Sequence, residues 1–232
     1  MASTFFGLTI AYSGLQAANT SLTITGHNVS NINTKGYTKQ QAGTQAADAL
    51  RTHTTYGAIG SGVVVTEISQ IRDSYYDVKY RNNMANYGQY SVKESYMGQI
   101  EDYLDEFTLN GYSQEYKNFF SAVNQLTITP GDTSAKNQLI NNAKSLADYF
   151  NTLTTNLRNV QADANNEIKD AVQQINSYAK NIAALNRQIN QIEANYGNAN
   201  DLRDKRNAMI DELSEIVNLE TSEEDMGNNV SN

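Results

Sequence analysis

Hydrophobic residues recur between residues 8 and 32 at alternating steps of three and four, the heptad spacing of a helix with one narrow apolar stripe. The stripe comprises Leu8, Ala11, Leu15, Ala18, Leu22, Thr25, Val29 and Ile32. The opposite face carries Ser13, Asn19, Thr20, Thr23 and Asn28, with no charged residue. Exposed helix faces often carry charged pairs, so a neutral face favours close packing against other chains. The alternative is an ordinary amphipathic helix with an unusual surface.

Residues 33–69 lack helical periodicity. Gly36 is suited to end the first helix, and residues 42–44 and 57–62 are typical of loops. Residues 63–66 form a short β-branched run and predict one strand. A second long helix, rich in tyrosine, is then expected to start near Ile68 and to run to about Phe107.

A shorter helix is expected next, between a break at residues 110–111 and Pro130-Gly131. Asp132 is a suitable N-cap for the longest periodic segment, residues 139–196. An extra four-residue step at Ile168 predicts a stutter in it. We expect its core to include Leu146, Phe150, Leu153, Leu157, Ile175, Ile182, Leu185 and Ile189.

A last helix, from Asn200 to about Glu215, precedes an alternating segment at 217–221 that is typical of a strand. The pattern predicts a mainly α fold, a long antiparallel helical bundle or coiled coil with a small β element. We expect three parts: 1–60, the heptad helix with an extended segment for assembly; 61–216, the helical bundle; and 217–232, the truncated start of a β-rich outer domain.

Composition excludes several functions. The 232-residue chain has no cysteine, which rules out disulfides and thiolate metal sites. Its net charge is -8, and the residues before Asp211 are nearly neutral, so no basic patch is present for nucleic acid. No apolar run reaches the length of a membrane span, and no secretory signal precedes the apolar start.

Side chains suited to catalysis are scarce. His27 and His53 are the only histidines, and neither has an acidic neighbour at metal-ligand spacing. The acidic residues between 101 and 106 are typical of a solvated helix face, and the glycines at 57–62 lack the strand–loop–helix context of a phosphate loop. We therefore expect no enzyme, no cofactor and no metal.

Residues 26–40 carry a motif in which a helix ends in Asn-Val-Ser-Asn and is followed by a polar turn and Gly-Tyr. This resembles the N-terminal signature of the axial proteins of the bacterial flagellum, with Asn28, Ser30, Asn31, Gly36 and Tyr37 in the matching places. Three later segments narrow the resemblance to the hook-associated protein 1 family of hook–filament junction proteins. They are residues 60–63 with 71–73, the helix through residues 174–186, and residues 200–206.

The resemblance implies a structural subunit that leaves the cell through the flagellar type III apparatus and assembles at the hook–filament junction of the extracellular flagellum. Assembly would use the stripe residues Leu8, Ala11, Leu15, Ala18, Leu22, Val29 and Ile32. The implied partners are identical subunits, hook protein, the second junction protein and a cytosolic export chaperone. That family returns with a C-terminal heptad helix, so we expect this chain to be the N-terminal part of a longer protein. The alternatives are a hook or rod protein and, in another class, a secreted coiled-coil effector or adhesin.

Overall fold

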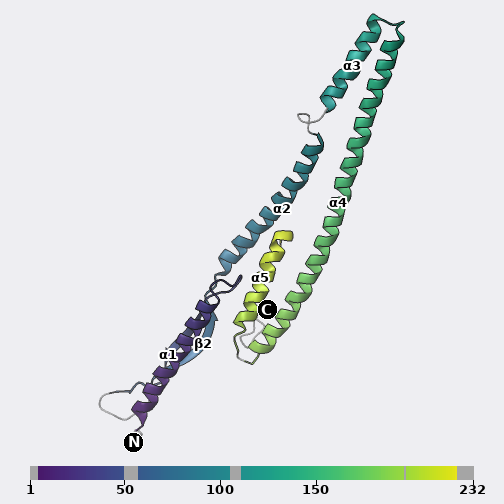
Figure 1. Ribbon diagram of the computed structural model, residues 1–232. Helices are drawn as coiled ribbons and strands as arrows, with labels where there is room; N and C mark the ends of the chain where they lie inside the picture. The colour runs from purple at the N-terminus through teal and green to yellow at the C-terminus, as the bar shows by residue number, and fades with distance from the viewer. Residues whose placement is uncertain (1–4, 50–56, 105–110, 196, 224–232) are drawn as a thin grey trace. The chain divides into compact units, whose positions relative to one another are not determined.

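The structure is a computed structural model that describes residues 5–49, 57–104, 111–195 and 197–223. Its elements follow the chain as α1 (Phe6–Ser30), β1 (Gln40–Ala46), β2 (Val63–Gln70), α2 (Ser74–Leu104), α3 (Tyr112–Ile128), α4 (Thr133–Glu193) and α5 (Asn200–Ile216) (Figure 1). The prediction of a mainly α fold with a small β element is confirmed.

Packing divides the chain into two compact units. One comprises residues 1–85 and 176–232, and the other comprises residues 86–175. Helices α2 and α4 each contribute to both units, because the division falls inside them. These limits differ from the boundaries expected at 60 and 216, which stay predictions.

The unit at 86–175 is an antiparallel helical bundle. Its contacts along α4 run in the opposite direction to those along α2 and α3. Tyr96 bonds Glu167, the rings of Tyr112 and Phe150 lie 5.8 Å apart, and Asn142 Nδ2 donates to the Asn118 carbonyl at 2.9 Å. Two helices in succession, α2 and α3, therefore lie along α4. Residues 105–110, where the Tyr-rich helix was expected to end, lie outside the described residues.

The stutter expected at Ile168 stays a prediction. Ile168 is 61% exposed, whereas the preceding Glu167 accepts a hydrogen bond from the Tyr96 hydroxyl. The polar residue thus occupies the position facing α2, and the apolar one faces outward. A pattern of hydrophobic residues alone could not identify a contact made by a carboxylate.

The start of α4 follows the expected capping geometry. Asp132 Oδ1 accepts the Ser134 backbone N–H at 2.9 Å, so one otherwise unpaired donor of the first turn is satisfied. At the other end, the Gly197 N–H donates to the Ile192 carbonyl at 3.2 Å, a six-residue turn typical of helix C-termini. The helix itself ends at Glu193, slightly before the expected limit, and Tyr196 lies outside the described residues.

The unit at 1–85 and 176–232 contains the β element, a two-stranded antiparallel sheet of β1 and β2. The register pairs Gln40 with Gln70 and Ala46 with Val63, with an irregularity at Gly43/Thr44. The strand expected at 63–66 is confirmed and extends to Gln70. The prediction of a loop at 42–44 is wrong, because those residues belong to β1.

Two further limits are corrected by the structure. Ile68 lies in β2, and the helix after it begins only at Ser74. Residues 217–221 form no strand: Val217 has an extended backbone, and residues 218–223 have no regular secondary structure. The expected outer domain beyond this point falls on 224–232, which lie outside the described residues.

Candidate functional site

Helix α1 lies against the β1–β2 hairpin through part of its uncharged face (Figure 1). Ala17 and Ile24 are buried there, and Ser13, Thr20 and Asn28 are half-buried. Their spacing of three and four residues defines a second stripe on the helix, distinct from the apolar one. The neutral face thus packs in part on the chain's own hairpin, where the sequence had favoured packing against other chains.

The start of β2 meets α1 at Ser13. The Val63 N–H donates to Ser13 Oγ at 3.2 Å, and that hydroxyl donates to the Ile10 carbonyl at 2.8 Å. Gly62, with φ of 113°, precedes this contact, and a Cβ there would lie 2.2 Å from Ser13 Oγ. Only glycine both adopts this backbone conformation readily and leaves room for the hydroxyl.

The other end of α1 is joined to β1 by Asn28. Its carboxamide Nδ2 donates to the Gln40 carbonyl at 2.8 Å, and its Oδ1 accepts the Gln40 N–H at 2.9 Å. Asn28 therefore pairs with both backbone groups of Gln40, as a neighbouring strand would. Gln40 is only 8% exposed, so these two polar groups would be costly to leave unpaired.

The Tyr37 hydroxyl completes the arrangement. It donates to Asn28 Oδ1 at 2.7 Å and lies 2.9 Å from His27 Nδ1. Because the single hydroxyl proton is used on Asn28, His27 Nδ1 must be the donor in the second contact. Burial, followed by the carboxylates of Asp201 and Asp204, raises the pKa of Tyr37 above its usual value.

The distance between the two anchors of α1, Ser13 and Asn28, matches the length of the strand β1. Ser13 and Asn28 are 15 residues apart, which is about 22 Å along a helix. The strand β1 runs from Gln40 to Ala46, about 20 Å at a rise of roughly 3.4 Å per residue. Hydrogen bonds at both ends therefore fix where the helix lies along the hairpin.

The turn after α1 packs on α5. Gly36 has φ of 81°, and a Cβ there would lie 2.8 Å from the Cβ of Ala208. The Thr38 N–H donates to Asp204 Oδ2 at 2.9 Å, and Gln40 Nε2 donates to Asp201 Oδ1 at 3.0 Å. The Gly-Tyr segment of the motif thus connects α1 and the hairpin to the last helix.

The remaining motif residues stabilise the end of α1 locally. Ser30 Oγ donates to the Gly26 carbonyl at 2.8 Å, and Asn31 Nδ2 donates to the His27 carbonyl at 3.0 Å. Asn31 Oδ1 in turn accepts the Thr34 hydroxyl at 3.2 Å. These contacts add side-chain hydrogen bonds to the last turn of α1, where the His27 carbonyl also accepts the Asn31 N–H at 3.1 Å.

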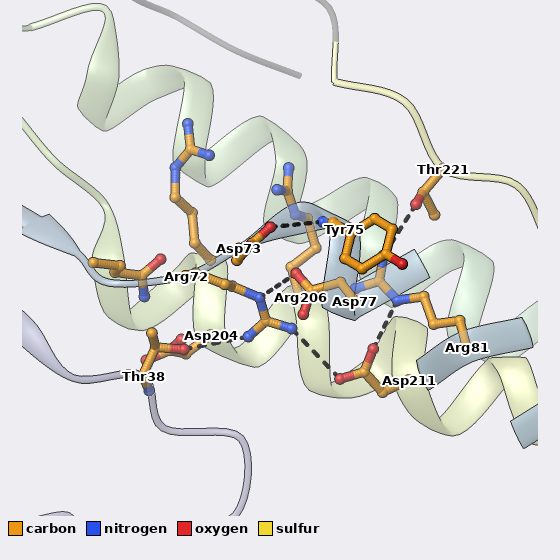
Figure 2. Close-up of polar contacts among 12 residues, drawn as sticks. Thr38, Arg72, Asp73, Tyr75, Asp77, Arg81, Asp204, Arg206, Asp211 and Thr221 are labelled. Carbon is orange, nitrogen blue, oxygen red and sulfur yellow. Dashed lines mark hydrogen bonds and ion pairs between the residues drawn. The ribbon is translucent and has the colours of Figure 1, made fainter. Parts of the chain in front are cut away.

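Arginines from three parts of the chain gather in one cluster (Figure 2): Arg72 follows β2, Arg81 lies on α2, and Arg203 and Arg206 lie on α5. Asp211 accepts a hydrogen bond from Arg81 Nε at 2.7 Å, and its other carboxylate oxygen lies 3.6 Å from Arg72 Nη2. Arg72 Nε also donates to Asp77 at 2.6 Å. Arg203 forms a bidentate pair with Glu193 at 2.6 and 2.8 Å. This hydrogen bonding raises the pKa of Arg203 further.

The apolar stripe of α1 has the opposite character, because its large side chains are exposed. The exposed fractions are 67% for Leu8, 59% for Leu15, 70% for Leu22, 64% for Val29 and 77% for Ile32. Ala11 and Ala18 are exposed as well. Single exposed hydrophobic residues are common, but a contiguous stripe of them is typical of an interaction surface.

The residues expected in the core of α4 differ in burial. Ile189 is fully buried. Leu146, Leu153, Ile175, Ile182 and Leu185 are half-buried, whereas Phe150 is 45% and Leu157 is 37% exposed. Their role as a common core stays a prediction.

Sequence reasoning did not identify the contacts that build this site. Ser13 and Gly62 lie in segments that the sequence had singled out, but nothing local indicated that they would meet. Asp211 carried no recognisable motif, and its arginine partners are distant in sequence. In the described residues, no group of three or more His, Asp or Glu side chains could hold a metal ion. Nor is any helix in this part of the chain both long and apolar enough to cross a membrane.

Comparison with known proteins places this arrangement in a family. Residues 97–231 match the family model described as "Flagellar hook-associated protein FlgK helical domain". The chain is 32% identical to flagellar hook-associated protein 1 of Bacillus subtilis (strain 168), over 99% of this chain and 46% of the relative. The same protein of Salmonella typhimurium is 33% identical over 94% of this chain and 39% of its own length, and that of Escherichia coli K12 is 32% identical over 94% and 40%.

The chain thus spans less than half the length of these curated relatives. The family model alone covers more than half of the chain, including all of α3, α4 and α5. The relatives extend the similarity to the α1 motif and the hairpin. The chain belongs to the flagellar hook-associated protein FlgK family, whose members are structural proteins of the bacterial flagellum.

Proposed function

We propose that this protein is a structural subunit of the hook–filament junction and that it assembles through the apolar stripe of α1. The observation that carries the proposal is the exposure of that stripe while the other face of the helix is anchored on the hairpin. A helix held in this way presents the same row of side chains in every subunit, as a repeating assembly requires.

The free energy available from the stripe is large. Burying a Leu, Val or Ile side chain fully stabilises by about 1.5–3 kcal/mol. Leu8, Leu15, Leu22, Val29 and Ile32 each retain more than half of their exposure. Covering all five would supply roughly 5–10 kcal/mol before the entropy cost of association.

The partners and the route of export follow from the family resemblance. We propose identical subunits beside it, hook protein and the second junction protein as neighbours, and a cytosolic chaperone before export through the type III apparatus. The relatives carry the name of a hook-associated protein, which supports a place in the extracellular flagellum.

The alternatives have less support. A hook or rod protein would share the α1 motif but would lack the long helical region, and residues 97–231 match a hook-associated protein model. A secreted coiled-coil effector or adhesin would be expected to carry charged positions along a solvated first helix, whereas the anchored face of α1 is uncharged.

Substitution of Leu22 by aspartate tests the proposal. Because Leu22 is 70% exposed, Leu22→Asp should leave the circular dichroism spectrum and thermal transition of the purified chain nearly unchanged. In a deletion strain complemented with the variant gene, it should abolish swarming and leave hooks without filaments in electron micrographs, since it would bury an unpaired charge.

Thr23→Asp is the matched control, because it adds the same charge at the adjacent, exposed position outside the stripe. Cells with this variant should swim. Normal swimming with Leu22→Asp, or equal loss of motility with both variants, would contradict assembly through the stripe.

A further inference from the structure

The segment after α5 lies over a polar cleft in the unit formed by residues 1–85 and 176–232. The cleft has a volume of about 880 Å³, and four arginines line it: Arg72, Arg81, Arg203 and Arg206. Residues 220–223 line the same cleft. Thus an acidic stretch of the chain and a group of arginines face one another.

Side chains hold the segment there. Arg81 donates to the Thr221 hydroxyl at 3.0 Å (Figure 2), Arg203 lies 3.4 Å from Glu223, and Arg206 forms an ion pair with the same Glu223 oxygen. Within the described part of the chain, residues 218–223 make no backbone–backbone hydrogen bond. Leu219 is the only half-buried residue among them.

Arg206 relies on Glu223 for its counter-charge, whereas the other arginines of the cleft have other carboxylate partners. Its side chain is 5% exposed, its Nε is buried without a hydrogen-bond partner, and its remaining contact is with the neutral Asn186 at 3.3 Å. By contrast, Arg72 and Arg81 share Asp211, and Arg203 has Glu193. Among the described residues, Glu223 is the one carboxylate that forms an ion pair with Arg206.

We propose that the arginine cleft is a docking site for the chain's own acidic segment, with Glu223 as the group it recognises. Removing Glu223 would leave a buried guanidinium without a counter-charge, which is the costly way to break such a pair. Docking fixes the direction in which the chain leaves α5. The curated relatives are more than twice as long as the matched region, so this direction sets how any following domain would be oriented. The inference does not depend on the proposed role at the junction.

The absence of cysteine allows a direct test. Spin labels on Ser222→Cys in the segment and Lys180→Cys on α4, both exposed positions of the same unit, report their separation by double electron–electron resonance. The 232-residue chain should give one narrow distance distribution. Glu223→Gln should raise the undocked fraction at least about tenfold, because a charge-assisted hydrogen bond to a buried group is lost.

Glu220→Gln is the matched control. It removes the same charge from the same segment, but Glu220 forms no ion pair within the described residues. The distance distribution of Glu220→Gln should stay narrow. In the unsubstituted chain, raising NaCl from 0.05 to 1 M should broaden the distance distribution, because Glu223 is half-exposed and its ion pairs are screened by salt. A broad distribution in the unsubstituted chain, no change with Glu223→Gln, or equal broadening with both variants would overturn the proposal.

Discussion

Asn28→Ala should detach the C-terminal end of α1 from the hairpin. The alanine removes both hydrogen bonds to the Gln40 backbone and the one that Tyr37 donates. The helix should survive, because alanine is a better helix former than asparagine. The damage is therefore expected in the joint between elements, and α1 itself should stay folded.

The expected magnitude follows from the burial of Gln40. A made hydrogen bond contributes about 0.5–1.5 kcal/mol net, and a buried polar group left unpaired costs about 1–3 kcal/mol. Two backbone groups of a residue that is 8% exposed lose their partner. The closed joint should thus be destabilised by roughly 2–4 kcal/mol, which corresponds to a roughly 30- to 700-fold change in the opening equilibrium.

Amide hydrogen exchange at Gln40 measures this opening directly, because its N–H donates to Asn28 Oδ1. Asn19→Ala is the control: it makes the same substitution in the same helix at an exposed position, so it carries the same gain in helix propensity. Exchange at Gln40 should accelerate in Asn28→Ala and stay unchanged in Asn19→Ala. Equal exchange rates in the two variants would refute the idea that Asn28 is the joint.

Two further predictions concern the turn and the bundle. Gly36→Ala should lower the free energy of unfolding by roughly 1–3 kcal/mol in urea titrations and by more than Gly57→Ala, because both glycines have positive φ but only a Cβ at position 36 would meet Ala208. The hydrogen bond to Glu167 raises the pKa of Tyr96 to about 12, so NMR should show this tyrosine titrating later than in Glu167→Gln. Because the folded chain holds that proton more tightly than the unfolded chain, the contact stabilises below about pH 10 and its contribution is lost as pH rises toward 12; an unshifted Tyr96 would contradict the contact.

The helices could be predicted from sequence because their signals are local. The spacing of Leu139, Leu146 and Leu153, the cap at Asp132 and the break at Pro130 all lie within a few turns of the structure they determine. The limits of α3, α4 and α5 are accordingly close to those expected. The hydrophobic pattern did not identify contacts made by polar side chains, as with Glu167 and Tyr96.

The strand β1 could not be predicted in the same way. Its sequence, Gln-Gln-Ala-Gly-Thr-Gln-Ala, has one β-branched residue and a glycine, which is typical of a loop. What makes it a strand is pairing with the strongly β-prone β2 on one side and Asn28 on the other. The converse holds at 217–221, where the alternation is suitable for a strand but these residues pair with neither strand of the described sheet.

The resemblance identified motif residues without their geometry. The motif residues Asn28, Gly36 and Tyr37 were identified through resemblance, and nothing local indicated that they would contact Gln40 and Ala208. The ion pairs of Asp211 with Arg72 and Arg81 join residues 130 or more positions apart. Such contacts depend on how α5 packs, which no local pattern specifies.

The two stripes of α1 suit two different tasks. A heptad row of Leu, Ala and Val favours burial but discriminates poorly between registers, because a shift of seven residues places similar side chains in the same positions. Hydrogen bonds are directional, so the contacts of Ser13 and Asn28 permit only one position along the hairpin. If the apolar stripe is the assembly surface that we propose, its register in the assembly is set by the hydrogen bonds of Ser13 and Asn28 in the second stripe. Substitutions at Asn28 should then disturb the alignment of subunits even though Asn28 lies outside that surface.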